Sequence, residues 1–163
     1  MENKNKKVFI INGRSGVGKD TLIGGLVEAG QHVLNVSTVD KVKEVALFAG
    51  WDGVKDDRGR QFLIDIRIAM VNYDDLINKY TVSKYQEFLT SDDEFMFIHC
   101  RDIPVIEYLK SQIPCKTILV TRNMQSISEH ACDQILHEYK YDIVFENDAP
   151  IEESKKSFIK HIY

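Results

Sequence analysis

Nine residues near the N-terminus carry the most specific chemical signal in this chain of 163 residues. The first seven of them fit the pattern G-x-x-x-x-G-K of a phosphate-binding loop, and all nine lie between a short apolar run and a helical pattern, as that loop requires. Its glycines let successive backbone N–H groups converge on one anion, and the helix N-terminus adds partial positive charge. The predicted nucleotide-binding residues of the loop are Gly13, Arg14, Ser15, Gly16, Val17, Gly18, Lys19, Asp20 and Thr21. We expect Lys19 to bind the β- and γ-phosphate oxygens and so to take part in catalysis.

Asp20 occupies the position at which such loops usually place a Ser or Thr hydroxyl for magnesium. A carboxylate is also a good ligand for this hard cation, directly or through water, so we predict that Asp20 binds Mg²⁺. The alternative is that Asp20 is an N-terminal helix residue that the helix dipole stabilises, and both can be true.

Charged residues also follow two later apolar runs, where strands of a parallel sheet present their ligands. Arg101 and Asp102 come after Phe95–Cys100, and Arg122 comes after Thr117–Val120. We expect Arg101 or Arg122 to stabilise the charge of a transferred phosphoryl group. Three roles are open for Asp102: it binds magnesium through water, it accepts the proton of the acceptor, or it is the N-cap of the next helix.

The histidines are expected to be structural. His99 alternates with Phe97 on one face of a strand, so a core histidine is favoured over a catalytic base. His130, Asp133 and His137 share one helical face, but they have no fourth ligand, and we expect a solvated surface there.

Five residues are predicted to bind a second substrate, a small phosphate acceptor. They are Asp40 and Lys43 after the second apolar run, and Arg58, Arg60 and Arg67 at or within the helical pattern Arg60–Tyr73. At about 100° per residue, Arg60 and Arg67 point the same way. The apolar residues predicted on this arginine side are Ile64, Ile68 and Val71.

The opposite stripe of this helix is predicted to face the body of the protein. It consists of Phe62, Ile66, Ala69 and Tyr73. The alternative is that Ile64 and Val71 pack under the segment Asp74–Leu89, while the two arginines pair with Asp56, Asp57 or Asp65.

Short apolar strands alternate with helices along the whole chain. The predicted strands are Val8–Ile11, Val33–Val36, Phe95–Cys100, Thr117–Val120 and Ile143–Phe145. The predicted helices are Thr21–Ala29, Thr38–Ala49, Arg60–Tyr73, Asp74–Leu89, Ile103–Ser111, Ser126–Tyr139 and one from about Ile151. This order predicts an α/β fold, a three-layer doubly wound parallel sheet of five strands. We expect one domain over residues 1–163, with residues 38–94 as a helical acceptor-binding insertion.

Composition limits the possible partners. A net charge of −4 argues against binding to a nucleic-acid backbone. Three scattered cysteines support neither a disulfide framework nor a zinc ribbon, and no apolar run is long enough for a membrane span. We expect a cytoplasmic protein with a small-molecule partner, and the sequence does not determine its oligomeric state.

Three segments together resemble a known family. Gly-Lys-Asp-Thr at 18–21 is similar to the loop of the P-loop deoxynucleoside monophosphate kinases of phages, and also of animal-type phosphomevalonate kinases. The stretch from Ser37 to Glu44 resembles S-x-A-D-P-L-K-E of the phage enzymes, with Asp40 and Lys43 matching. The stretch from Tyr141 to Asp148 resembles Y-D-x-V-I-x-N-D of guanylate kinases and their relatives.

The resemblance implies a P-loop NTPase of the nucleoside monophosphate kinase type that uses ATP and Mg²⁺. In guanylate kinases and their relatives, the segment after the last of these stretches lies beside the ATP base. Because Asn147, Asp148, Ala149 and Pro150 follow the last predicted strand, we predict that the adenine ring lies against this turn and that Arg122 covers it from the end of the fourth strand. A (deoxy)nucleoside monophosphate is the favoured acceptor. Two alternatives stay open: a kinase of another small metabolite such as phosphomevalonate, and a nucleotide-binding regulator without turnover, because residues 121–126 hold one arginine where these kinases carry several.

Overall fold

The computed structural model describes residues 6–123 and 139–163 of the chain. The strands are β1 (Lys7–Asn12), β2 (Val33–Ser37), β3 (Phe95–His99), β4 (Lys116–Thr121) and β5 (Ile143–Glu146). The helices are α1 (Lys19–Glu28), α2 (Asp40–Phe48), α3 (Asp57–Asp74), α4 (Leu76–Thr90), α5 (Ile103–Gln112) and α7 (Ile151–Ile162). Two predictions lie on residues 124–138, outside the described residues: the helix Ser126–Tyr139, apart from its last residue, and the cluster of His130, Asp133 and His137.

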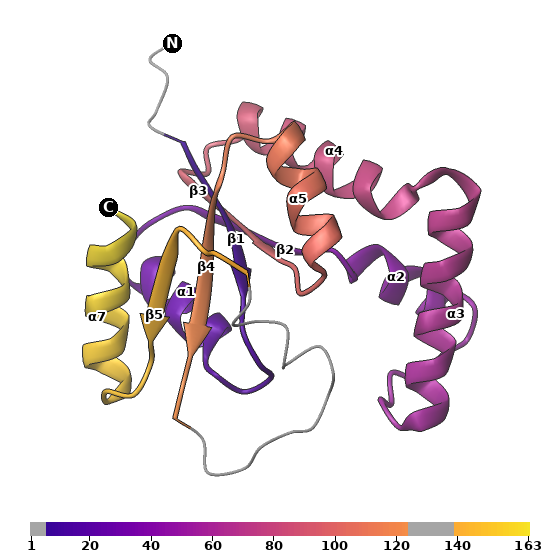
Figure 1. Cartoon of the computed structure of the whole chain (residues 1–163), viewed down its shortest axis with the longest axis horizontal. Helices are drawn as coiled ribbons and strands as arrows, with labels where there is room; N and C mark the ends of the chain where they lie inside the picture. The colour runs from indigo at the N-terminus through magenta and orange to yellow at the C-terminus, as the bar shows by residue number, and fades with distance from the viewer. Residues whose placement is uncertain (1–5, 124–138) are drawn as a thin grey trace.

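All five strands are parallel and lie in the order β2-β3-β1-β4-β5 (Figure 1). The central strand β1 is buried on both faces, because it is an almost unbroken apolar run. Its residue Ile11 is paired with His99 on one side and Ile118 on the other. The carboxyl ends of the strands therefore form one common edge, with β1 at its centre.

Helices cover both faces of this sheet. On one face, α1 and α7 pack on side chains such as Phe9, Phe97 and Val120. On the other face, α4 and α5 pack on Ile10, Met96 and neighbouring residues. The three-layer α/β architecture and the parallel five-stranded sheet expected from the sequence are thus confirmed.

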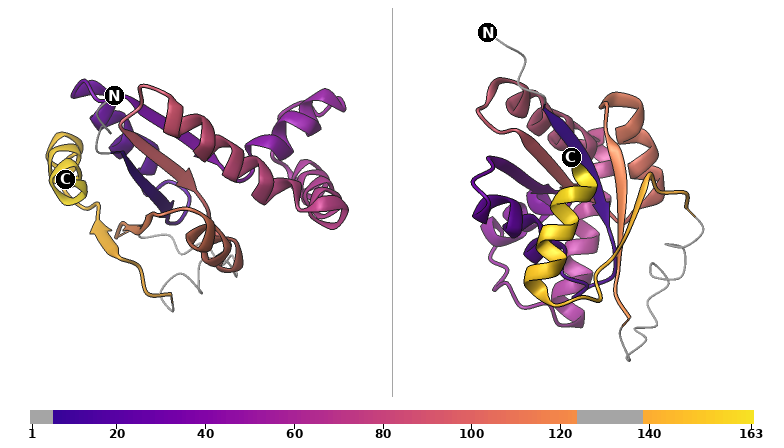
Figure 2. Two further views of the ribbon diagram at one scale, coloured as in Figure 1. Left: turned by 90° about the horizontal axis from the view of Figure 1, so that it is seen from above. Right: turned by 90° about the vertical axis from the view of Figure 1, so that its left-hand side faces the viewer.

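Helices α2 and α3 extend beyond the edge of the sheet at β2 (Figures 1 and 2). A small apolar cluster centred on Val42, Met70 and Ile77 joins them to the start of α4. The second half of α4 instead lies on the sheet, where Tyr85 and Phe88 belong to its core. Of the helical segment 38–94, then, α2 and α3 project, and α4 is shared with the main body.

The buried face of α3 differs from the predicted stripe. Leu63, Ile66 and Met70 pack against α2 and α4, whereas Tyr73 is 82% exposed and Ala69 is also exposed. Of the predicted stripe only Ile66 belongs to this cluster, and the prediction was wrong for Ala69 and Tyr73. Apolar side chains occupy more than one side of this helix, so periodicity alone does not select the packed side.

The exposed apolar residues of α3 also correct the alternative interpretation. Ile64, Ile68 and Val71 are 49%, 52% and 42% exposed, so they are not packed under α4.

The start of α3 also differs from the prediction. The helix begins at Asp57, three residues earlier than predicted, because Asp56 is its N-cap and accepts a hydrogen bond from the Gly59 amide at 2.7 Å.

Candidate functional site

The loop between β1 and α1 has the backbone that a phosphate cradle needs. Gly13, Gly16 and Gly18 have φ of 146°, 79° and 93°, values that residues other than glycine rarely adopt. A Cβ at Gly13 would lie 2.5 Å from the carbonyl oxygen of Val120, and one at Gly18 would lie 2.5 Å from Nδ2 of Asn147. Both the conformation and the close packing therefore require glycine at these two positions.

Buried amide side chains fix this loop to the sheet. Oδ1 of Asn12 accepts a hydrogen bond from the Gly13 amide at 2.7 Å, and its Nδ2 donates to the Tyr141 hydroxyl at 2.8 Å. Nδ2 of Asn147 donates to the Val17 carbonyl at 2.7 Å. Sequence reasoning missed Asn12 and Tyr141. An amide that ends an otherwise apolar strand was the available signal for Asn12.

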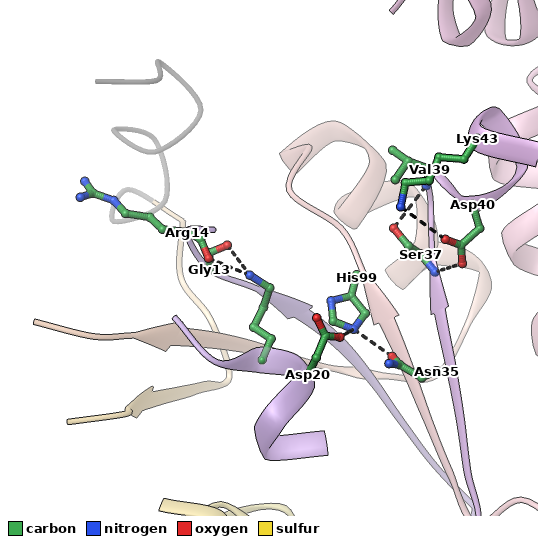
Figure 3. A network of polar contacts seen from close by, with 10 residues as sticks. Gly13, Arg14, Asp20, Asn35, Ser37, Val39, Asp40, Lys43 and His99 are labelled. Atoms are coloured by element: carbon green, nitrogen blue, oxygen red, sulfur yellow. Dashed lines mark hydrogen bonds and ion pairs between the residues drawn. The ribbon is translucent and has the colours of Figure 1, made fainter. Parts of the chain in front are cut away.

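The ammonium group of Lys19 lies within the curve of the loop. It donates to the carbonyl oxygens of Gly13 at 2.7 Å and Arg14 at 2.9 Å (Figure 3). Ser15 and Gly16 at the tip are exposed, and α1 begins at Lys19 itself, so its N-terminal amides are directed toward the loop. An anionic phosphate fits this combination of glycine backbone, ammonium and helix N-terminus.

Asp20 extends from the first turn of α1 toward the end of β3 (Figure 3). Its carboxylate is 85% exposed, and Oδ1 lies 3.5 Å from Nε2 of His99. The same Nε2 lies 2.8 Å from Oδ1 of Asn35 on β2. Burial lowers the pKa of His99 below its ordinary value, and the nearby Asp20 carboxylate opposes that effect. His99 thus has polar partners at the carboxyl edge of the sheet.

The predicted acceptor residues after β2 take part in a local turn. Oδ2 of Asp40 accepts a hydrogen bond from the Ser37 amide at 2.7 Å, and Nζ of Lys43 lies 4.0 Å from Oδ1 of the same carboxylate (Figure 3). The backbone of the turn is tied to β3, because the Thr38 amide donates to the His99 carbonyl at 3.1 Å. Asp40 therefore stabilises the start of α2. A role of Asp40 or Lys43 in binding an acceptor stays a prediction.

Arg67 connects the projecting α3 to the main body. Its guanidinium donates to Oδ2 of Asp102 at 2.5 Å. Asp102 lies at the N-cap position of α5, as one alternative expected, but its side chain makes no capping hydrogen bond. The expected pairing of Arg67 with Asp56, Asp57 or Asp65 was wrong, because the side of α3 that carries Arg67 is turned toward the end of β3.

The three arginines predicted for the acceptor are not brought together. Arg58 and Arg67 are nine residues apart in the same helix, which at about 100° per residue places them on opposite sides. Arg58 lines a hollow of about 670 Å³ with Trp51 and Phe62. Arg60 is on the same side as Arg67, is exposed, and lies 3.8 Å from Asp57.

The remaining predicted residues lie at the carboxyl edge. Arg101 and Arg122 follow β3 and β4 and are both exposed. Oδ1 of Asp148 accepts a hydrogen bond from the Asn123 amide at 2.7 Å, which joins the segments after β4 and β5. Asn147 is buried against the phosphate loop, so its position beside an adenine ring stays a prediction.

A cation at this edge would need oxygen ligands besides those of the protein. In residues 6–123 and 139–163, no group of three or more His, Cys, Asp or Glu side chains could hold a metal ion. The exposed Asp20 carboxylate next to the phosphate loop fits a hard divalent cation that phosphate oxygens also bind.

Among the described residues, no helix is long and apolar enough to cross a membrane.

No family model and no curated protein matches the chain. Solved structures do. Dephospho-CoA kinase from Campylobacter jejuni is 14% identical, with 96% of each chain covered and a TM-score of 0.59. TT1252 from Thermus thermophilus is 16% identical, with 98% of this chain and 100% of the other covered and a TM-score of 0.51. At these identities the likeness shows the fold alone, which this chain shares with a solved kinase, and it does not show the phage deoxynucleoside monophosphate kinase family.

Proposed function

We propose that this protein is an ATP- and Mg²⁺-dependent phosphotransferase that acts on a small phosphorylated acceptor. The observation that carries the proposal is the phosphate loop at the end of the central strand, with the Lys19 ammonium inside it and Asp20 beside it. The same site lies at the strand ends of a sheet whose fold is shared with a solved kinase.

The roles of the residues follow from their positions at the carboxyl edge. Lys19 and the loop amides hold the β- and γ-phosphates, and Asp20 holds the cation, which would neutralise phosphate charge when bound. Arg101 and Arg122 are exposed at the ends of β3 and β4, where a guanidinium can stabilise the transferred group. Positioning and charge stabilisation supply most of the catalysis in such a transfer, and the protein need not form a covalent bond.

We place the acceptor on the side of α3 that carries Arg60 and Arg67. That side is joined to the end of β3 through Asp102, and it exposes Ile64, Ile68 and Val71. Guanidinium groups beside an apolar wall suit a ligand with both a phosphate and a ring, since Arg can bind oxygens and also stack. A (deoxy)nucleoside monophosphate is the first candidate with that chemistry.

A second candidate is a kinase of a different small metabolite. It is favoured by the likeness to a dephospho-CoA kinase, whose name indicates an acceptor that is not a simple monophosphate. Phosphomevalonate and dephospho-CoA therefore belong in the same acceptor panel as the nucleoside monophosphates.

A coupled assay of ADP release tests the proposal. ATP with Mg²⁺ should give ADP faster with one member of the panel than with water alone, and Lys19→Ala should abolish the difference. If ATP binds but no phosphate ester stimulates ADP release, the protein is a nucleotide-binding regulator and the phosphotransferase proposal fails.

A further inference from the structure

Three side chains from separate elements meet beside the phosphate loop: Asp20 of α1, Asn35 of β2 and His99 of β3 (Figure 3). A single nitrogen, Nε2 of His99, faces oxygens of both neighbours. Oδ1 of Asn35 lies 2.8 Å from it, and Oδ1 of Asp20 lies 3.5 Å from it.

The two oxygens determine which ring nitrogen carries the proton. An unprotonated Nε2 would direct its lone pair at two acceptors, which is repulsive, so Nε2 is a donor. It donates to Oδ1 of Asn35, and the Asp20 carboxylate lies within ion-pair distance of the same nitrogen. Turning the Asn35 amide would not remove the conflict, because Asp20 offers only oxygens to Nε2.

The His99 ring is held more firmly than the carboxylate that it faces. Its side chain is 18% exposed, compared with 85% for Asp20. The backbone carbonyl of His99 accepts hydrogen bonds from both the amide and the hydroxyl of Thr38, at 3.1 Å and 3.3 Å. An exposed carboxylate by itself samples several rotamers, so the contact with a fixed N–H restricts the carboxylate rather than the ring.

We propose that His99 is a positioning residue for Asp20. Its Nε2–H, oriented by Asn35, holds Oδ1 of the carboxylate and leaves Oδ2 for the cation that accompanies the nucleotide. The inference rests on the proposed function, because it assumes a cation and a nucleotide at this loop. Hydrogen-bonded partners of ligating carboxylates typically contribute about ten- to hundredfold to metal affinity.

Calorimetry with a non-hydrolysable ATP analogue tests this without relying on turnover. We define the affinity gain as a ratio: the affinity for the analogue measured with Mn²⁺ is divided by the affinity for the analogue measured in EDTA. His99→Leu should reduce the gain about tenfold and leave the affinity in EDTA unchanged. His99→Gln should restore most of it, because a glutamine amide carries an N–H at a similar reach.

Two further variants complete the experiment. His32→Leu is the matched control, because His32 is exposed at the opposite end of the sheet, directly before β2, and should leave the gain unchanged. Asn35 is exposed on the edge strand β2, so Asn35→Ala should not disturb folding. This variant removes the acceptor that orients the His99 ring, and it should also reduce the affinity gain.

The inference would be overturned if both His99→Leu and Asn35→Ala left the affinity gain unchanged. It would also be overturned if the affinity gain of His99→Gln were as small as that of His99→Leu. Either result would leave the proposed function standing. A protein that bound the analogue neither with Mn²⁺ nor in EDTA would overturn both.

Discussion

At the scale of single residues, the loop lysine has the largest expected effect. Lys19→Ala should weaken ATP binding by roughly 1.5–3 kcal/mol, about ten- to hundredfold, because it removes charged hydrogen bonds to phosphate. Calorimetry measures the affinity, and circular dichroism measures the fold. Lys156→Ala, on the exposed side of α7, is the matched control. Equal affinities for Lys19→Ala and this control would contradict the role of the loop.

His99 also makes stability depend on pH. Its pKa in the folded protein is lowered, so the unfolded chain binds the proton first as the pH falls. The stability from neutral His99 is therefore complete above the ordinary pKa of 6.5 and is lost as the pH falls below it. Thermal melting between pH 8 and pH 5 should show a smaller loss for His99→Gln than for the unsubstituted chain. Parallel melting profiles would exclude this contribution.

At the scale of elements, the phosphate loop depends on glycine for two separable reasons. Gly18 and Gly30 have similar φ, 93° and 85°, but only Gly18 would bring a Cβ against another residue. Gly30→Ala should therefore cost about 1 kcal/mol for the backbone conformation alone. Gly18→Ala should cost more, because it also disturbs Asn147, and it should weaken nucleotide binding. Denaturant unfolding of both variants measures the difference, and equal losses would show that the contact with Asn147 is not needed.

A lysine from near the N-terminus caps the C-terminal end of α4. Nζ of Lys6 donates to the carbonyl oxygens of Phe88, Ser91 and Asp93 at 2.7, 2.9 and 2.8 Å, and it lies 4.4 Å from the centre of the Phe88 ring. Lys6→Met should lower the free energy of unfolding by about 1–3 kcal/mol, because those carbonyls lose a charged donor.

Lys7→Met is the comparison for that prediction. Nζ of Lys7 makes longer contacts, 3.2 and 3.1 Å, to the carbonyls of Ile162 and Tyr163 at the C-terminus. Denaturant unfolding should show a clearly smaller loss for Lys7→Met. A loss as large as that of Lys6→Met would mean that the end of α4 does not depend on Lys6 in particular.

At the scale of the whole molecule, the pair of Arg67 and Asp102 joins the projecting helices to the sheet. Both side chains are about 40% exposed, so the ion pair itself should add little to stability. Arg67→Ala should instead raise KM for the acceptor or lower kcat, with ATP affinity nearly unchanged. Steady-state kinetics, once an acceptor is known, measures this.

Arg58→Ala distinguishes the two sides of α3. Arg58 lines the hollow with Trp51 and Phe62, on the side opposite Arg67. If the acceptor lies between α3 and the phosphate loop, Arg58→Ala should change acceptor kinetics much less than Arg67→Ala. A larger effect of Arg58→Ala would move the acceptor to the hollow.

The sequence by itself determined the features that contiguous residues encode. The apolar run before Asn12 and the glycines at 13, 16 and 18 specify a strand and a loop of unusual φ with little help from distant residues. The alternation of such runs with helical patterns was enough for the parallel sheet, since connections between parallel strands follow few topologies.

Only the tertiary structure decided which distant side chains meet. The contact of Asn147 with Val17 spans 130 residues along the chain, and it exists because β5 and the loop lie at the same edge of one sheet. Likewise, strand order places Asn35 of β2 next to His99 of β3, and helix packing brings Arg67 to Asp102. Sequence periodicity did not resolve the packed side of α3, because apolar residues occupy more than one side of that helix and only its neighbours select one.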